Sequence, residues 1–253
     1  MTSVPSLLHP VVGRASSGGV LFDFDGTLSP IVESPSAARL LDGGSEILER
    51  LVARYKLVGV LSGRPVEFLA PLLPSGVVVA GLYGLEVLRD GTRVDHPLAG
   101  SWREAIEDVA QCSHARGPRG MHVESKGLSL TLHYRSHPEI AGEVEDWARS
   151  QAKRSGLVVR PARMSIELHP PINTDKGTAL EALAEDLDAV CYLGDDVGDL
   201  PAVDALDRLA ATGVYTVRVA VSSEESPEEL LKRADLVLDG PDAVLRFLHS
   251  LLP

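Results

Sequence analysis

Two aspartates follow a short apolar run near the start of the chain. The stretch VLFDFDGT, residues 20–27, places Asp23 and Asp25 one residue apart, directly before a Gly-Thr pair. In an extended strand both carboxylates point to one side and Phe24 points to the other. Three arrangements without catalysis compete with a reactive site: a turn that satisfies backbone N–H groups, a calcium loop, and a solvated acidic surface. The early Gly26 and the missing later oxygen ligands disfavour the calcium loop, and the pair alone leaves the other two open.

A second acidic group follows another apolar run. The stretch YLGDDVGD, residues 192–199, supplies Asp195, Asp196 and, one helical turn further on, Asp199. Several carboxylates that meet at one edge of a sheet are costly unless a cation lies among them. Oxygen ligands without a convincing set of histidines or cysteines favour Mg²⁺ over Zn²⁺. Mg²⁺ also accepts phosphate oxygens as ligands, so the two acidic groups together predict a site for a phosphorylated substrate.

Two further stretches suit a phosphate. LSGRP, residues 61–65, places Ser62 and Gly63 after a predicted strand and at the start of a predicted helix. NTDKGTALEAL, residues 173–183, places Lys176 near another helix start, where its ammonium could neutralise phosphate charge. The chain contains neither G-x-x-x-x-G-K-[ST] nor G-x-G-x-x-G, so a nucleotide-binding loop is not indicated.

The elements that position these residues alternate between strands and helices. Short apolar runs predict buried parallel strands at 19–24, 57–62, 77–84, 189–194, 216–221 and 235–239, with helices between them at 43–55, 65–73, 177–187 and 226–233. This alternation indicates an α/β fold with a doubly wound, mostly parallel sheet. In such a sheet ligands bind beyond the carboxyl ends of the strands, where the acidic and Ser-Gly stretches fall. We expect the first 18 residues to be loosely ordered.

The segment 97–170 has a different pattern. Helical stretches alternate with pairs of strand-like stretches in the order αββ–αββ, which predicts a small antiparallel sheet backed by two helices. Pro97 and Pro170-Pro171 are plausible hinges. We therefore expect a core made of residues 1–96 and 171–253, with an α+β domain of residues 97–170 inserted into it.

The composition excludes several classes of partner. A net charge of −12 argues against nucleic acid and against an anionic membrane surface. No apolar run approaches the roughly 20 residues of a membrane helix, and the N-terminal stretch lacks the pattern of a signal peptide. Cys112 and Cys191 show no metal-binding spacing and are expected to be reduced thiols. We expect a cytoplasmic monomer.

The order D-x-D-G-T, S-G-R, K-G and G-D-D-x-x-D resembles the haloacid dehalogenase superfamily of phosphatases. The stretches GLYGLEV (81–87), ESKGLSLTLHYR (124–135) and MSIELHPPINTDKGTAL (164–180) are also similar to the cap and flanking motifs of the trehalose-6-phosphate phosphatase family. The similarity extends from residue 20 to about residue 250. It implies a haloacid dehalogenase-like Rossmannoid core and makes the inserted domain a cap for substrate specificity.

The resemblance also implies catalytic roles. Asp23 would be the nucleophile that forms an aspartyl-phosphate, and Asp25 would protonate the leaving sugar oxygen and then activate water. Ser62 and Lys176 would complete the catalytic group. A Mg²⁺ cofactor would be held by Asp23, the Asp25 carbonyl and Asp195, with Asp196 or Asp199 in support.

Substrate binding is implied in the same way. Gly63 and Arg64 would bind the phosphate end of the substrate. Glu124, Lys126 and Glu167 would hold hydroxyls of a disaccharide, whereas without the family motif each would be read as a solvated charge on a strand.

The function implied by the resemblance is Mg²⁺-dependent hydrolysis of trehalose 6-phosphate, a small-molecule sugar phosphate. One alternative is a phosphatase for another sugar phosphate, including a trehalose-like pseudodisaccharide phosphate. Another is an inactive homologue that binds a sugar phosphate and regulates a synthase. The intact acid/base aspartate disfavours this regulator, because a pure binding protein has no need of it.

Overall fold

The computed structural model describes residues 5–32, 34–162, 164–224 and 226–252. The chain divides into two compact units. The core unit comprises the chain up to Val94 and from Thr174 onward, and the cap unit comprises Asp95–Asn173. Within the described ranges, no helix combines the length and the apolar character that crossing a membrane requires.

The core unit is built on an eight-stranded sheet with the order β12-β11-β10-β1-β2-β3-β4-β5. The strands are β1 (Gly18–Phe22), β2 (Leu57–Leu61), β3 (Val78–Gly81), β4 (Glu86–Arg89), β5 (Thr92–Asp95), β10 (Ala189–Gly194), β11 (Tyr215–Ser222) and β12 (Leu236–Asp239). All neighbours from β12 to β3 pair in parallel, and β4 runs antiparallel to β3. The sheet is therefore mostly parallel, with an antiparallel extension at one edge.

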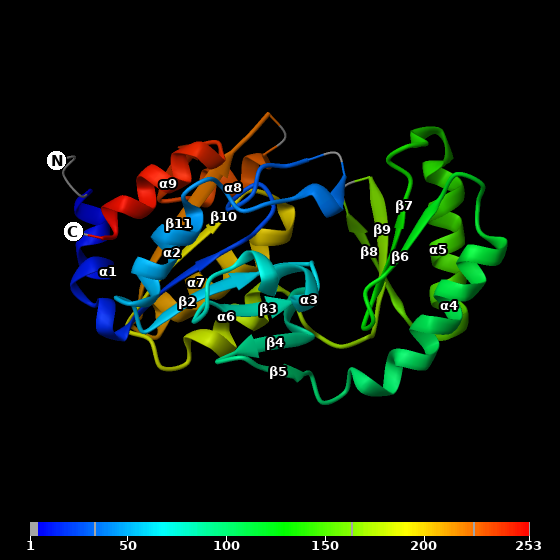
Figure 1. Ribbon diagram of the computed structural model, residues 1–253, viewed down its shortest axis with the longest axis horizontal. Coiled ribbons are helices and arrows are strands. Elements are labelled where there is room, and N and C mark those ends of the chain that lie inside the picture. The colour runs from blue at the N-terminus through cyan, green and yellow to red at the C-terminus, as the bar shows by residue number, and fades with distance from the viewer. Residues whose placement is uncertain (1–4, 33, 163, 225, 253) are drawn as a thin grey trace. The chain divides into compact units, whose positions relative to one another are not determined.

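Helices cover both faces of this sheet (Figure 1). Successive residues of β1 belong to opposite layers: Val20 and Phe22 pack in one apolar cluster and Leu21 packs in the other. The first layer includes α1 (His9–Gly13), α2 (Gly44–Val52), α3 (Val66–Leu69) and α9 (Pro241–Ser250), and the second includes α6 (Lys176–Ala184) and α7 (Leu200–Ala211). Helix α8 (Glu228–Arg233) contributes a smaller cluster with α7 and β11. Burial on both faces explains why the central strands are uninterrupted apolar runs, and the doubly wound α/β prediction is confirmed.

Short 3₁₀ turns connect these elements. They are η1 (Ser6–Leu8), η2 (Ala15–Ser17), η3 (Pro35–Ala37), η4 (Ala70–Leu72), η5 (Leu82–Gly84) and η8 (Val197–Asp199) in the core unit, with η6 (Gly100–Trp102) and η7 (Pro138–Ile140) in the cap unit.

Two expectations about the core unit require correction, and several elements were missed. The first 18 residues are not loosely ordered where the structure describes them, because Leu8 and Val11 are fully buried. The strand expected at 77–84 ends at Gly81, since Leu82 and Tyr83 have φ angles of 50° and 59° and turn the chain. The β4–β5 hairpin and helices α1, α7 and α9 were not predicted.

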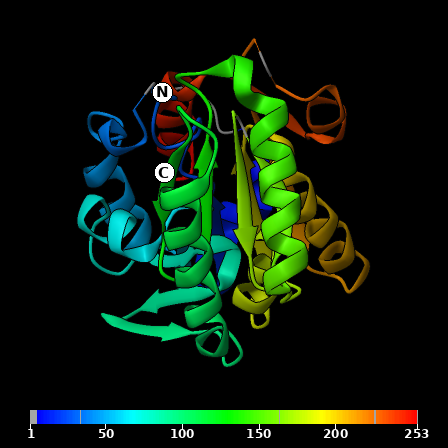
Figure 2. The same ribbon diagram turned by 90° about the vertical axis from the view of Figure 1, so that its right-hand side faces the viewer.

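The cap unit is a four-stranded antiparallel sheet with two helices on one face. The order β6-β7-β9-β8 is formed by β6 (His122–Ser125), β7 (Leu130–His133), β9 (Ser165–His169) and β8 (Val158–Ala162). Helices α4 (Arg103–Arg116) and α5 (Ala141–Ser155) pack side by side on this sheet (Figure 2, green ribbons). Ile106, Val144, Leu132 and Ile166 belong to the apolar core between helices and sheet. The prediction of an inserted α+β cap is confirmed.

Candidate active site

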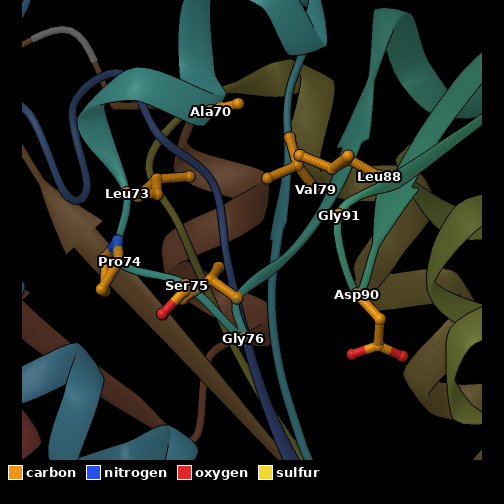
Figure 3. A pocket seen from close by; sticks show the side chains of 10 residues that line it. Ala70, Leu73, Pro74, Ser75, Gly76, Val79, Leu88, Asp90 and Gly91 are labelled. Atoms are coloured by element: carbon orange, nitrogen blue, oxygen red, sulfur yellow. The ribbon is translucent and has the colours of Figure 1, made fainter.

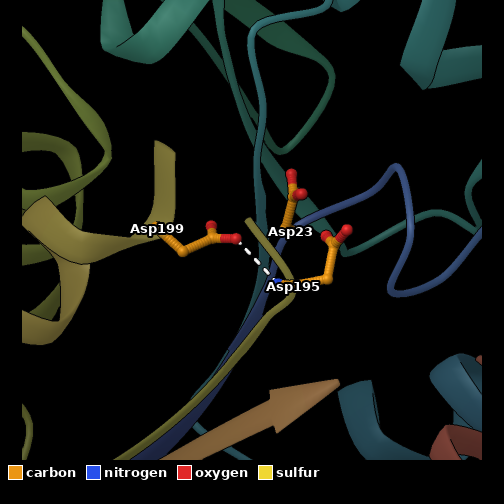
Figure 4. A group of neighbouring side chains, drawn as sticks. All are labelled: Asp23, Asp195 and Asp199. Atoms are coloured by element: carbon orange, nitrogen blue, oxygen red, sulfur yellow. Dashed lines mark hydrogen bonds between the residues drawn. The ribbon is translucent and has the colours of Figure 1, made fainter. Parts of the chain in front are cut away.

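Asp23 and Asp195 are brought together by strand pairing. Phe22 of β1 lies opposite Leu193 of β10, so the residues that follow the two strands emerge side by side. The Asp23 N–H donates to the Leu193 carbonyl at 2.8 Å. One carboxylate oxygen from each of Asp23, Asp195 and Asp199 lies within 4.8 Å of the others, and all three residues are buried (Figure 4). The two acidic stretches therefore meet at the carboxyl end of the sheet.

Asp199 is saturated with hydrogen bonds. Its Oδ2 accepts the N–H groups of Asp195 and Asp196 at 2.8 and 3.0 Å, and Figure 4 shows the first of these bonds. Its Oδ1 accepts a hydrogen bond from the Lys176 ammonium at 2.7 Å and another from the Tyr192 hydroxyl. Because a carboxylate has about four lone-pair sites, Asp199 is fully occupied in holding the turn and the lysine.

Lys176 is the buried cation of the site. It is the first residue of α6, whose start is fixed by a capping box between Asp175 and Thr178. Its Nζ lies 2.8 Å from Asp23 Oδ1 as well as contacting Asp199. Burial lowers the pKa of Lys176, but Asp199 and Asp23 raise it, and the net pKa lies well above the ordinary value. The residue is therefore an ammonium ion.

Among the residues that the structure describes, the carboxylates of this cluster carry more negative charge than the Lys176 ammonium balances. Burial raises the pKa of Asp23 well above its ordinary value; Lys176 opposes this, while Asp199 and Asp195 add to it. Burial, together with Asp199 and Asp196, raises the pKa of Asp195 to about 7. Burial also raises the pKa of Asp196, whose carboxylate accepts the Gly198 N–H at 2.7 Å. A second cation at this cluster would relieve the repulsion that these shifts report.

Gly26 allows the loop after β1 to pass close to Asp195. Its φ is 77°, and a Cβ at this position would lie 2.0 Å from Asp195 Oδ2. The neighbouring Thr27 hydroxyl approaches Asp195 Oδ1 at 3.5 Å. Only glycine leaves the Asp195 carboxylate in its observed position.

Replacing Gly26 with alanine is expected to displace this carboxylate and to raise the divalent-metal concentration required for half-maximal activity by at least about tenfold. Gly43→Ala is the matched control, because Gly43 has a similar φ of 81° but nothing within 4 Å of the added Cβ. Both variants place alanine at a similar positive φ, so the difference in metal requirement reports mainly the contact with Asp195. An unchanged metal requirement in Gly26→Ala would show that this carboxylate has no part in metal binding.

The Ser62 turn follows β2 at the same edge of the sheet. Ser62 is buried, and its Oγ accepts the Arg64 N–H at 3.1 Å. A Cβ on Gly63 would lie 2.5 Å from the Tyr83 hydroxyl, so glycine is required for this packing. Glu86 accepts the Val66 N–H and thereby fixes the residues that follow the turn.

Arg64 does not extend into solvent. Its Nε and Nη2 donate to the two oxygens of Asp25 at 2.6 and 2.7 Å. The two aspartates of the D-x-D motif therefore have different cationic partners: Lys176 contacts Asp23, and Arg64 contacts Asp25.

The remaining predicted residues lie in the cap unit, on the sheet face opposite its apolar core. Glu124, Thr131, Glu167 and Arg160 are paired in register across the four strands. Glu124 contacts His133 at 2.7 Å, and Glu167 accepts from the Ser129 hydroxyl at 2.8 Å with Lys126 at 4.0 Å. Glu124 and Glu167 thus belong to a polar row across the sheet, and Lys126, which follows β6, lies near Glu167.

Two further residues that lie at these sites were not predicted. The Tyr192 hydroxyl donates a hydrogen bond to Asp199. The sequence feature that could have indicated this contact is a tyrosine two positions before the end of a buried strand. Thr131 lies between the two glutamates, and its buried hydroxyl has no hydrogen-bond partner within the described ranges. The alternation of LTLH in β7 places Thr131 on the polar face, which was the available signal.

A cavity of about 230 Å³ lies elsewhere in the core unit, lined by Ala70, Leu73–Val77, Val79, Leu88, Asp90 and Gly91 (Figure 3). It includes the residues that lead into β3, at the amino end of that strand. The aspartates follow the carboxyl ends of the parallel strands. This cavity therefore lies at the other end of the strands, away from the acidic cluster.

Solved structures define the class of fold. A haloacid dehalogenase-like hydrolase from Bacteroides thetaiotaomicron matches with a TM-score of 0.68 at 16% identity, covering 94% of this chain and 100% of the other. The C-terminal domain of Candida albicans trehalose-6-phosphate phosphatase matches with a TM-score of 0.76 at 24% identity, covering 99% and 98%. The chain therefore has a haloacid dehalogenase-like fold: a Rossmann-like core with an inserted cap.

The chain belongs to the trehalose-phosphatase family, whose model matches residues 21–235. A trehalose-phosphate phosphatase from Mycobacterium tuberculosis is 34% identical over 250 residues, which cover 94% of this chain. The match spans 62% of that relative's length. The family resemblance inferred from the motifs is confirmed.

Proposed function

We propose that this chain is a Mg²⁺-dependent phosphatase that hydrolyses trehalose 6-phosphate to trehalose and phosphate. The observation that carries the proposal is a buried Asp23 at the carboxyl end of β1, between the Lys176 ammonium and the Asp195 carboxylate. The family membership and the mycobacterial relative support trehalose 6-phosphate as the substrate. The two free cysteines, Cys112 and Cys191, agree with a protein of a reducing compartment.

The donor set fits a hard divalent cation. Carboxylate oxygens of Asp23 and Asp195 converge, and burial together with neighbouring carboxylates raises the pKa of both groups beside Lys176. We assign Mg²⁺ to Asp23, Asp195 and the backbone carbonyl of Asp25, with Asp196 and Asp199 in support. Since Asp199 already accepts four hydrogen bonds, its support consists in fixing Lys176 and the turn at Asp195. When bound, Mg²⁺ would neutralise phosphate charge and hold the phosphoryl group in place.

The proposed reaction then proceeds in two steps. An Asp23 oxygen attacks phosphorus while the bond to the sugar oxygen breaks, and Asp25 gives that oxygen its proton. Asp25 next takes a proton from water, whose oxygen attacks the aspartyl-phosphate and releases inorganic phosphate. Lys176 neutralises charge on the phosphoryl oxygens, and the hydroxyl of Ser62 donates a hydrogen bond to one of them.

The direct test is phosphate release from trehalose 6-phosphate, measured beside glucose 6-phosphate and other sugar phosphates with Mg²⁺ present. Preference for trehalose 6-phosphate in kcat/KM is expected. Faster turnover of another sugar phosphate or of a pseudodisaccharide phosphate would assign a different substrate to the same chemistry. Binding without release of phosphate would identify a regulator instead.

Glu124 and Glu167 are proposed to hold sugar hydroxyls, as the family resemblance implies. Replacing either with alanine is expected to lower kcat/KM for trehalose 6-phosphate about ten- to hundredfold, the loss of one charge-assisted hydrogen bond. Hydrolysis of 4-nitrophenyl phosphate, which has no sugar hydroxyls, should change little. Glu139→Ala is the control within the cap unit, because Glu139 is exposed in η7 and its carboxylate forms a hydrogen bond with His137.

Equal losses on both substrates would indicate damage to folding or a shared catalytic role for these glutamates. No loss on either substrate would make them solvated charges, and the disaccharide assignment would then depend on family membership alone.

A further inference from the structure

Arg64 connects three segments of the core unit. Besides its two bonds to Asp25, its Nη1 donates to the Pro35 carbonyl at 2.8 Å. The guanidinium lies over the Phe68 ring, 4.3 Å from the ring centroid. Phe68 in turn packs edge-on against Phe24, with centroids 6.4 Å apart and an interplanar angle of 81°. The side chain is therefore held at its charged edge and on its flat face.

This arrangement differs from an ordinary surface ion pair. The Arg64 side chain is 16% exposed and that of Asp25 is 37% exposed. Isolated exposed pairs contribute little because both side chains must be ordered to form them. In a bidentate arginine–carboxylate pair with a stacked guanidinium, both side chains are already held in one conformation before a substrate binds. Such a pair fixes the plane of the carboxylate as well as its position.

The same contacts argue against a role of Arg64 in binding the substrate phosphate. The Nε–Nη2 edge is taken by Asp25, and Nη1 is taken by Pro35. The Nε–Nη2 edge is therefore closed to a phosphate, and at the other edge Nη1 is already engaged by a backbone carbonyl.

We propose that Arg64 is a positioning residue that orients the Asp25 carboxyl group for proton transfer to the leaving oxygen. The inference rests on the proposed function, in which Asp25 is the acid and base. As the Asp23–phosphorus bond forms and the phosphorus–oxygen bond to the leaving group breaks, the Asp25 proton moves to the leaving oxygen. The carboxylate that remains is stabilised by the two N–H groups of Arg64, and it then accepts a proton from the attacking water.

The test compares phenyl phosphate with 4-nitrophenyl phosphate, which differ mainly in the basicity of the leaving oxygen. The more basic phenolate depends more strongly on a proton from Asp25. Arg64→Ala is expected to lower kcat/KM for phenyl phosphate about tenfold more than for 4-nitrophenyl phosphate. Arg64→Lys should fall between Arg64→Ala and the wild type, because lysine keeps the charge but not the planar fork.

A phosphate-binding Arg64 would give equal losses on both aryl phosphates and weaker inhibition by inorganic phosphate. A merely structural Arg64 would give equal losses together with a lower Tm. Either result would overturn the proposal. Phe68→Leu, which removes the stacking and keeps the ion pair, provides a milder variant with the same expected direction should Arg64→Ala fold poorly.

A double-mutant cycle separates this inference from the proposed function. In an Asp25→Asn background, Arg64→Ala should cause no further leaving-group-dependent loss, because the group that it positions is gone. A full additional loss would overturn the positioning role. The aryl phosphates contain no sugar, so they test Asp25 and Arg64 independently of the substrate assignment. A wild-type protein that hydrolyses them but not trehalose 6-phosphate would refute the substrate assignment and leave the role of Arg64 standing.

Discussion

Asp23→Asn is expected to lower kcat by at least about 10³-fold, or roughly 4 kcal/mol of activation free energy, in a chain that remains folded. The amide is close in shape to the carboxylate but is a poor nucleophile and a poor metal ligand. Burial and the neighbouring aspartates already disfavour the charge on Asp23, since they raise its pKa. Loss of the charge should therefore leave Tm unchanged or raise it. Phosphate release and thermal unfolding measure the two effects.

Asp188→Asn is the control for this substitution. Asp188 is exposed just before β10, at the strand end opposite Asp195. It should retain wild-type kcat. If Asp23→Asn kept more than a tenth of wild-type activity, Asp23 would not be the nucleophile.

Removal of divalent metal with EDTA is expected to abolish activity, and Mg²⁺ should restore it. The physical reason is that, within the described residues, several buried carboxylates face the ammonium of Lys176. A readout independent of turnover is available, because an ion that binds only the folded chain raises Tm. Mg²⁺ should raise the Tm of the wild type, and the rise should be smaller for Asp195→Asn.

Full activity after exhaustive chelation would contradict the metal assignment. So would a Tm that does not respond to Mg²⁺ in the wild-type protein. Either result would leave Lys176 to balance the cluster without a divalent ion.

The meeting of the two acidic stretches could be predicted from the sequence because it depends on backbone topology. Apolar runs that end in aspartate identify strand ends, and parallel strands bring such ends to one edge of a sheet. The partners of Arg64 and Lys176 were not predictable in this way. Which oxygen an arginine reaches across 39 positions, as Arg64 reaches Asp25, depends on side-chain packing that no local pattern encodes.

The missed elements have local explanations. The hairpin of β4 and β5 consists of two four-residue strands with exposed positions, so it lacks the long apolar run that marks the central strands. Helix α1 is short, and Pro10 and Gly13 at its ends are typical of loops as well as of helix boundaries. Only tertiary packing, which buries Leu8 and Val11, distinguishes the two.

The position of β1 in the sheet has a consequence for biosynthesis. β1 pairs with β2 on one side and with β10 on the other, and the whole cap unit separates β1 from β10 in the chain. A nascent chain that has emerged only as far as the cap carries β1 as a bare strand edge, of the kind that promotes aggregation. The cap, a contiguous segment with its own apolar core, can fold during this interval. Strand β10 covers the free edge of β1, and it also brings Asp195 next to Asp23. The acidic cluster therefore forms at the same moment as the exposed edge is paired.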